Sequence, residues 1–323
     1  MTQRQVTGFK IVFSNVLFFF LTLLVGLGFA ELLLRLKNSD QKNYNIEMWR
    51  YAKLLKVRSA DPDLGHEHRP GTHATLEGVE VRINSLGMRG PEPDLADTSK
   101  KRILFLGSSN TLGWGVAEKD TLCGILRGKL AESAQIFNAG IGNYNAHRYV
   151  SLYEKRLQAV HPDMVVIHYF IRDAENLQPG GGNWLLRNSE LAVMLHTMIY
   201  EMGYGSKNAS GLVDHYKKMY SDGSPGLESM RTAMRRLDEL SKEQHFKIII
   251  AMVPDIHAVQ PYPFTFIHER VRELAASYGW TFVDLSEALS RVPQKELWVM
   301  LGDPHINAKG QSLMAETLLP YLS

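Results

Sequence analysis

The sequence predicts an α/β fold in which a parallel β-sheet lies between two layers of helices, preceded by one N-terminal membrane helix. From residue 101 onward, short apolar runs alternate with stretches of helical periodicity, and this alternation is typical of right-handed β-α-β units. The run at residues 164–170 is continuously apolar, as a parallel strand buried on both faces requires. Residues 11–30 are almost all apolar, and this stretch predicts the membrane helix.

The N-terminal apolar stretch is long enough to cross a bilayer, because twenty helical residues cover about 30 Å. The layout fits a signal anchor, and it also fits a signal peptide cleaved near the small residues Gly28 and Ala30. The apolar run continues through residues 32–34, which favours an uncleaved anchor over residues 1–37. Basic residues flank both ends of the span, so their count does not set its orientation, although long domains translocate largely regardless of charge.

Residues 38–100 are polar, with scattered proline and glycine, and we interpret them as a linker and an edge segment. Within them, residues 79–83 alternate between apolar and polar side chains and predict an edge strand. The following SLG and RGPEP stretches indicate turns.

The α/β domain is expected to cover residues 101–323. Its predicted strands and helices follow in order, with a helical insertion at about residues 174–223 that we interpret as a lid or wall of the substrate site, or as a helix packed on the fold. The strands are expected at 102–107, 136–140, 164–170, 247–253 and 281–285, and the helices at 121–133, 146–160, 224–244, 263–279 and 308–322.

Composition excludes several classes of function. The formal net charge of +2 gives no general attraction to nucleic acid, so no nucleic-acid partner is expected. Cys123 is the only cysteine, so the sequence contains neither a zinc-binding cysteine spacing nor an intrachain disulfide. We expect no cofactor and no metal.

Chemically capable residues follow the strand ends and precede the last helix. The first strand ends in GSSNTLG (residues 107–113), the second in NAGIGN (138–143) and the third in IRD (171–173), and DPH (303–305) precedes the last helix. Serine at a strand-to-helix turn needs a base to become a nucleophile, and a histidine oriented by a carboxylate supplies one. A phosphate-binding loop would explain the glycines but not the Asp-x-His motif, and the lysine of a P-loop is absent.

On these motifs the chain resembles the SGNH/GDSL hydrolases, specifically a membrane-anchored branch associated with envelope or exported-polysaccharide modification. GSSNTLG resembles the first family block, NAGIGNYN the second and DPHIN the last, and RINSLGMRGPE resembles the segment that precedes the domain in that branch. The resemblance covers about residue 79 to the C-terminus. It implies a flavodoxin-like parallel sheet in a three-layer sandwich.

The resemblance also implies the roles of the site residues. Ser109 would be the nucleophile, His305 the base and Asp303 the residue that orients it. The N–H groups of Ser109 and Asn143 would hold the oxyanion, together with Arg172, which stands where the family has an asparagine. Arg172 could donate to the oxyanion with its charge, or it could pair with the neighbouring Asp173 and leave the hole one donor short. Ser108 stands where the family usually has aspartate.

The resemblance implies a serine-dependent esterase or O-acyltransferase that acts on acyl esters of carbohydrate, with acetyl as the expected acyl group. Water or a sugar could accept the acyl group, and the sequence leaves both open. Two alternatives remain: a catalytically degenerate, anchored binding or assembly factor in polysaccharide export, and a nucleotide-binding flavodoxin-like module. The expected location is a single-pass N-terminal anchor with the catalytic domain in the periplasm or otherwise outside the cytoplasm.

Overall fold

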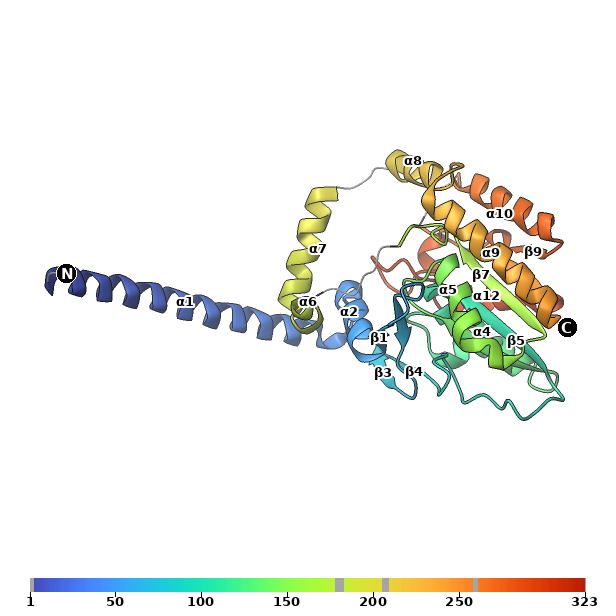
Figure 1. Cartoon of the computed structure of the whole chain (residues 1–323), viewed down its shortest axis with the longest axis horizontal. Helices are drawn as coiled ribbons and strands as arrows, with labels where there is room; N and C mark the ends of the chain where they lie inside the picture. Colours follow the sequence, from blue (N-terminus) through green and yellow to red (C-terminus); the bar gives the residue numbers. More distant parts are fainter. Residues whose placement is uncertain (1–2, 178–182, 205–208, 258–260, 323) are drawn as a thin grey trace. The chain divides into compact units, whose positions relative to one another are not determined.

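The computed structural model describes residues 3–177, 183–204, 209–257 and 261–322 (Figure 1). Contacts divide the chain into two compact units. One comprises Met1–Trp49 together with Gly182–Gly205, and the other comprises Arg50–Gly181 together with Ser206–Ser323.

The larger unit is built on a five-stranded sheet with the order β6-β5-β7-β8-β9, and all four of its neighbouring strand pairs are parallel. Counted along the sheet's own strands, this is the 2-1-3-4-5 order of flavodoxin-like folds, which confirms the predicted fold class. The strands span β5 (Lys101–Gly107), β6 (Ala134–Gly140), β7 (Met164–Phe170), β8 (Lys247–Val253) and β9 (Thr281–Asp284).

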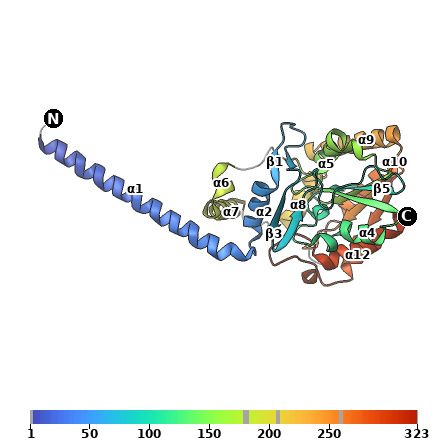
Figure 2. The same ribbon diagram turned by 90° about the horizontal axis from the view of Figure 1, so that it is seen from below.

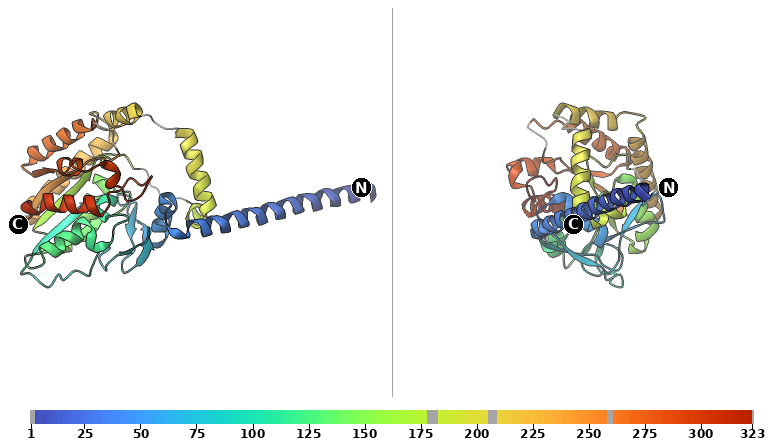
Figure 3. Two further views of the ribbon diagram at one scale, coloured as in Figure 1. Left: turned by 180° about the vertical axis from the view of Figure 1, so that it is seen from behind. Right: turned by 90° about the vertical axis from the view of Figure 1, so that its left-hand side faces the viewer.

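Side chains alternate between the two faces along each strand. Apolar side chains therefore lie on both faces of this sheet, and helices cover both. Leu104 and Leu106 of β5 pack in one apolar cluster and Ile103 and Phe105 in another. The first cluster includes residues of α5 (Ala146–Leu152), α9 (Pro225–Gln244) and α10 (Thr265–Tyr278). The second includes residues of α4 (Leu122–Lys129), α11 (Ser286–Ser290) and α12 (Ala308–Leu318). Figures 2 and 3 show these layers.

Shorter helical segments connect these elements. α5 continues into a π-helical turn and a 3-10 turn, so the helix predicted at residues 146–160 changes its winding after about half of its length. The segments are α3 (Ser109–Leu112), η2 (Glu118–Asp120), η3 (Tyr153–Leu157), η4 (Gln158–Val160), η5 (Gln294–Glu296) and η6 (Leu319–Tyr321).

Residues 50–100 are more ordered than a linker implies. Two antiparallel pairs, β1 (Lys56–Arg58) with β2 (His66–His68) and β3 (His73–Leu76) with β4 (Val79–Arg82), follow α2 (Tyr44–Leu54). Large apolar side chains of this segment are buried, among them Leu55, Leu64, Leu76, Val81, Ile83 and Met88. The predicted edge strand therefore forms, but it pairs with β3 in a separate small sheet. The connecting residues Glu77 and Gly78 both have positive φ, as two-residue hairpin turns require.

The smaller unit contains α1 (Gln3–Lys37), η1 (Asn38–Asp40), α6 (Trp184–Asn188) and α7 (Glu190–Tyr204). Residues 13–40 are long and apolar enough to cross a membrane, by length and composition. Of the predicted insertion, α6 and α7 belong to this unit, whereas α8 (Ala209–Met219) belongs to the larger one. Residues 178–182 and 205–208 of that insertion lie outside the described residues.

Candidate active site

Ser109 is the first residue of α3, directly after the tight turn that leaves β5. The turn needs glycine at position 107, because a Cβ there would lie 2.1 Å from Thr111 Oγ1 and 2.9 Å from the His168 carbonyl oxygen. Gly113, with φ of 76°, ends α3, and its N–H donates to the Ser109 carbonyl. The tight turn leaves the Ser109 side chain partly exposed, where a substrate can reach its hydroxyl.

His305 and Asp303 reach Ser109 from the turn before α12. The His305 ring lies between the other two residues, with its Nε2 2.7 Å from Ser109 Oγ and its Nδ1 2.6 Å from Asp303 Oδ1. A carboxylate accepts hydrogen bonds only, so Nδ1 carries the proton and Nε2 accepts the Ser109 hydroxyl. The three residues therefore form a continuous hydrogen-bonded chain in the order that proton transfer from serine requires.

Asp303 is completely buried, with 0% of its surface exposed. Burial by itself would raise the pKa of Asp303, but the hydrogen bonds and the charge of His305 outweigh it and hold that pKa below its ordinary value. Oδ1 also accepts the His305 backbone N–H at 2.7 Å, and Oδ2 accepts the Trp114 indole N–H at 3.2 Å. The buried carboxylate is thus kept ionised by donors on both oxygens.

The sequence analysis missed Trp114, although this residue follows the serine motif directly in GSSNTLGW. Its indole is 1% exposed, and a buried indole N–H needs an acceptor. A tryptophan at that spacing was the available signal, but the sequence does not say which acceptor it reaches.

Helix α12 links the histidine turn to the serine turn. Asn307 caps its N-terminus, and the Val299 N–H donates to the His305 carbonyl at 3.1 Å. Gln311 accepts the Leu122 N–H at 2.9 Å and donates to the Asn110 carbonyl at 3.3 Å. These contacts fix the distance between two segments that lie almost two hundred residues apart.

Arg89 supports the serine turn from its other side. Its guanidinium is buried and donates to the carbonyl oxygens of Leu112, Gly113 and Val116 at 2.6–2.8 Å. Its backbone N–H donates to the Asn138 carbonyl, which connects the turn after β5 to strand β6. Arg89 lies in the RINSLGMRGPE motif, and the sequence analysis gave it no role.

Asn143 follows β6 and has φ of 64°, a left-handed conformation that asparagine tolerates. Its carbonyl accepts from Arg148 at 3.2 Å. The preceding residue, Gly142, is bonded at both its N–H and its carbonyl to residues of the 50–68 segment. The backbone around Asn143 is therefore held from outside the loop.

Arg172 pairs with Glu175. Its Nε and Nη2 donate to Glu175 Oε2 at 3.0 and 2.7 Å, and its side chain is 54% exposed. Asp173 is buried and accepts the Phe170 N–H at 3.1 Å, and burial raises its pKa to about 8.

Two other groups are part of the scaffold. His168 lies in β7 and bonds Thr111 Oγ1 at 3.1 Å, and burial lowers its pKa to about 3. Cys123 is buried in α4 and burial raises its pKa to about 12. Across the described ranges, no group of three or more histidine, cysteine or acidic side chains could hold a metal ion.

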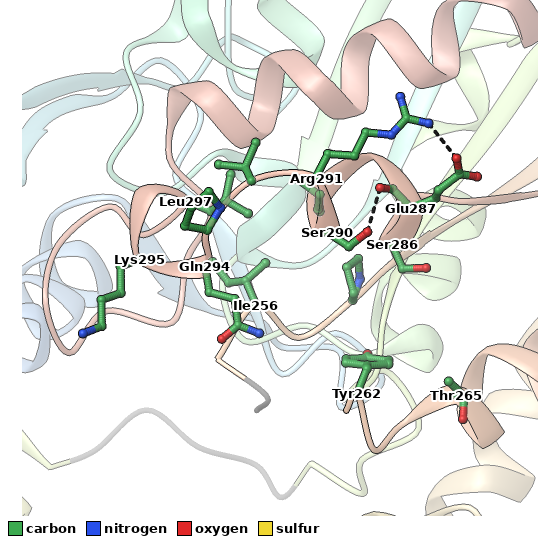
Figure 4. A pocket seen from close by; sticks show the side chains of 14 residues that line it. Ile256, Tyr262, Thr265, Ser286, Glu287, Ser290, Arg291, Gln294, Lys295 and Leu297 are labelled. Carbon is green, nitrogen blue, oxygen red and sulfur yellow. Dashed lines mark hydrogen bonds and ion pairs between the residues drawn. The ribbon is translucent and has the colours of Figure 1, made fainter. Parts of the chain in front are cut away.

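A cavity of about 740 Å³ opens beyond the carboxyl ends of β8 and β9 (Figure 4). Its size is that of small-molecule sites, and its wall includes Ile256 and Leu297. Leu297 accepts the Asn307 N–H at 2.8 Å, which connects the cavity wall to the histidine turn. Ser109, Asp303 and His305 are not among the lining residues.

No protein-family model matches the chain, and no curated protein matches its sequence. The solved structures that it resembles include a putative lipolytic protein of the G-D-S-L family from Desulfitobacterium hafniense (16% identity, TM-score 0.45, 68% of this chain and 99% of that one). They also include an acetylxylan esterase from Geobacillus stearothermophilus, with 19% identity and a TM-score of 0.44 over 70% of this chain and 95% of that one. A lipase/acylhydrolase from Enterococcus faecalis has 16% identity and a TM-score of 0.43 over 69% of this chain and 95% of that one. These likenesses are too weak to decide a function, which rests on the geometry.

Proposed function

We propose that this chain is a serine-dependent hydrolase or acyltransferase of the SGNH/GDSL type that acts on acyl esters. One observation carries the proposal: Ser109, His305 and Asp303 form a hydrogen-bonded chain with heavy-atom distances of 2.7 and 2.6 Å. The serine is partly exposed, whereas the aspartate is fully buried. That combination leaves the nucleophile accessible and keeps the orienting carboxylate away from water.

The reaction follows from the direction of these hydrogen bonds. His305 Nε2 takes the proton of the Ser109 hydroxyl as Oγ attacks the ester carbonyl, and Asp303 stabilises the imidazolium that forms. Collapse of the tetrahedral intermediate breaks the bond to the alcohol, and His305 returns the proton to that leaving oxygen. Water or a second hydroxyl group, deprotonated by His305, then removes the acyl group from Ser109.

The developing oxyanion is proposed to bind the backbone N–H groups of Ser109 and Asn143. Ser109 begins α3 and Asn143 follows β6, so both come from turns at the carboxyl edge of the sheet. Arg172 stays a proposed third donor. In the structure its Nε and Nη2 donate to Glu175, so donation to the oxyanion would require the guanidinium to shift or to share its donors.

We propose a small acyl group, acetyl above all, on a carbohydrate hydroxyl in the cell envelope or an exported polysaccharide. The sequence resemblance supports this substrate class. The apolar helix α1 supports an anchored enzyme, and we propose that its catalytic domain lies outside the cytoplasm.

The test is turnover of p-nitrophenyl acetate and of an acetylated xylo-oligosaccharide by the full chain in mild detergent. Ser109→Ala is expected to abolish turnover. Ser108→Ala is the matched control, since Ser108 is buried and makes no capping hydrogen bond with its side chain. If an added free sugar is acetylated at the expense of acetate release, the protein is an acyltransferase. If acetate release matches p-nitrophenol release and is independent of sugar, it is an esterase.

A second candidate function is a non-catalytic binding or assembly factor, favoured by arginine at position 172 and its contact with Glu175. Wild-type protein that turns over neither ester, while remaining folded, would favour this candidate.

A further inference from the structure

The peptide unit that joins Gly142 to Asn143 is held by side chains that the triad does not use. His66 Nε2 lies 3.0 Å from the Gly142 carbonyl oxygen, and Lys56 Nζ donates to the same oxygen at 3.2 Å. A carbonyl only accepts, so His66 carries its proton on Nε2. Burial, with a smaller effect of the Lys56 charge, lowers the pKa of His66 to about 2, which favours the neutral ring that donates to this carbonyl.

The N–H of Gly142 is also hydrogen-bonded, at the end of a series of hydrogen bonds whose donors and acceptors can be assigned in only one way. His68 Nδ1 lies 2.9 Å from the Gly87 carbonyl and must donate to it, so His68 Nε2 accepts the Tyr51 hydroxyl proton at 2.6 Å. The Tyr51 oxygen then accepts the Gly142 N–H at 3.1 Å. Burial lowers the pKa of His68 to about 3, consistent with the neutral ring that this series of hydrogen bonds requires.

Gly142 is also the residue that lets Tyr51 approach. A Cβ at position 142 would lie 2.7 Å from Tyr51 Cε1, closer than carbon atoms pack. Lys56 lies over the Tyr51 ring with its Nζ 4.5 Å from the ring centre. The glycine, the tyrosine and the lysine therefore form one packed group around the second loop.

A planar trans peptide couples its two polar groups rigidly, because the carbonyl of Gly142 and the N–H of Asn143 belong to one plane and point in opposite directions. Two donors that fix the carbonyl therefore fix the direction of the Asn143 N–H. They also polarise the peptide, since hydrogen bonds in a chain strengthen one another. Removing the donors would allow this plane to rotate away from the oxyanion.

We propose that His66 and Lys56 are positioning residues that aim the Asn143 N–H at the oxyanion through the Gly142 carbonyl. The inference rests on the proposed function, because it needs Asn143 to be an oxyanion donor. It gives the 50–68 segment a role in the reaction although none of its side chains belongs to the triad.

The experiment compares His66→Ala and Lys56→Met with the wild-type full chain. Each is expected to lower kcat on p-nitrophenyl acetate about 10- to 100-fold, less than complete loss of one oxyanion donor, with KM changed less than twofold. A boronic acid that forms a tetrahedral adduct with serine should lose affinity by the same factor as kcat. His66→Gln should recover most of the rate, because its amide can donate to the same carbonyl.

The matched control is Lys155→Met, which removes a lysine that pairs with Asp61 and Asp63 of the same segment without contacting Gly142. It is expected to keep wild-type kcat. Variants of His66 and Lys56 that lose thermal stability but keep kcat and boronate affinity would overturn the positioning role alone. An inert wild-type protein would overturn the proposed function and this inference with it.

A second inference comes from the smaller unit and is independent of the first. The N-terminus of α7 is bound to the last turns of α1: Glu31 accepts the backbone N–H groups of Glu190 and Leu191 at 3.1 and 2.9 Å. Arg35 donates to the Asn188 carbonyl at 2.6 Å. Figures 1 and 3 show that α7 then runs across the direction of α1, not along it.

Beyond this junction, α7 exposes a series of large apolar side chains, and α6 exposes two more. A helix of fifteen residues covers only about 22 Å and is too short to span a bilayer. An apolar helix fixed crosswise at the end of a membrane-length helix suits the membrane surface. The exposed side chains are Trp184, Leu185, Met194, Leu195, Met198, Ile199, Tyr200 and Met202.

We infer that α6 and α7 lie in the interface of the bilayer that α1 spans. This inference rests on the proposed anchoring by α1. The occupant of the apolar face is lipid, because the face continues from the end of the candidate membrane span.

The test uses Ile199→Cys in the full chain in phospholipid nanodiscs, labelled with a water-soluble maleimide. Native Cys123 is fully buried and is expected to remain unlabelled. Leu301→Cys is the reference, since Leu301 is 88% exposed and belongs to the larger unit. Position 199 should react at less than a tenth of the reference rate in nanodiscs and at an equal rate in denaturant. Equal rates in nanodiscs would overturn the inference, and a chain that does not enter nanodiscs would overturn the anchor as well.

Discussion

Trp114→Phe removes one hydrogen bond from the buried carboxylate of Asp303 and leaves the other contacts of the triad in place. The lost donor lies 3.2 Å from Oδ2 in a site without solvent, and a hydrogen bond to a charged group contributes about 1.5–3 kcal/mol. Since 1.36 kcal/mol corresponds to one pKa unit, the pKa of Asp303 should rise by about 1–2 units in the variant.

The sign of the pH effect follows from linkage. The pKa of Asp303 is lowered in the folded protein, so its ionised form stabilises the fold above the unfolded value near 3.8 and loses this contribution as pH falls. The variant brings the folded pKa closer to the unfolded one. The free energy of unfolding should therefore fall by about 1.5–3 kcal/mol near pH 7, in addition to a packing loss that does not depend on pH, and the difference should shrink toward pH 3.

The assay is urea unfolding of the full chain in mild detergent, followed by far-UV circular dichroism from pH 3.5 to 7.5. Tyr153→Phe is the control, because the hydroxyl of buried Tyr153 donates to the neutral side-chain oxygen of Gln244. Its effect on stability should be the same at every pH. A wild-type-to-variant difference for Trp114→Phe that is equally independent of pH would refute the role of this hydrogen bond.

Three further predictions concern the triad and its neighbours. Ser109→Ala and His305→Ala should each abolish ester turnover without unfolding the protein, and the double variant should lose no more than either single one, because the residues act as a unit; a much larger loss in the double variant contradicts the triad. The raised pKa of Asp173 should make the free energy of unfolding of the wild type fall by up to about 1.4 kcal/mol per unit as pH rises from about 4 to 8. Asp173→Asn should flatten this dependence, and equal wild-type stability in urea at pH 5 and pH 8 contradicts the prediction. If the Arg172 guanidinium is an oxyanion donor, Arg172→Ala should lower kcat about 10²- to 10³-fold. A change in kcat below threefold would contradict that role and would favour a structural role through the exposed pair with Glu175, which contributes about 0–1 kcal/mol to the free energy of unfolding.

The sheet was predictable because its strands are continuous apolar runs separated by helices. The strand at residues 164–170 and the strand at 247–253 have the predicted bounds. The other three differ by one or two residues at their ends. The meeting of Ser109 with His305 was predictable as well, since the motifs at the ends of this fold share one edge of the sheet.

The structure of residues 50–100 could not be predicted from the sequence in the same way. Their strands have three or four residues, too few for a clear period. Their contacts with the site join residues far apart in the chain, such as Tyr51 with Gly142 and Arg89 with Leu112. Propensity and spacing do not encode such pairings.

The partner of Arg172 was also beyond the sequence. Asp173 is its neighbour, but the turn that follows β7 buries this carboxylate and leaves Glu175 within reach of the guanidinium. The choice between the two acidic residues depends on which one the backbone directs inward, and that is a property of the folded turn.

The central claim is that Ser109 is a nucleophile activated by His305, and the most direct measurement is covalent labelling by a fluorophosphonate. The serine oxygen attacks the phosphorus of this reagent and displaces fluoride to form a phosphonate ester, and the attack requires the hydroxyl to be activated by a base. Intact mass spectrometry and peptide mapping of the full chain should show a single adduct on Ser109, absent in Ser109→Ala and in His305→Ala and retained in Ser108→Ala. No adduct on the folded wild-type chain, or an adduct on another serine, would contradict the account.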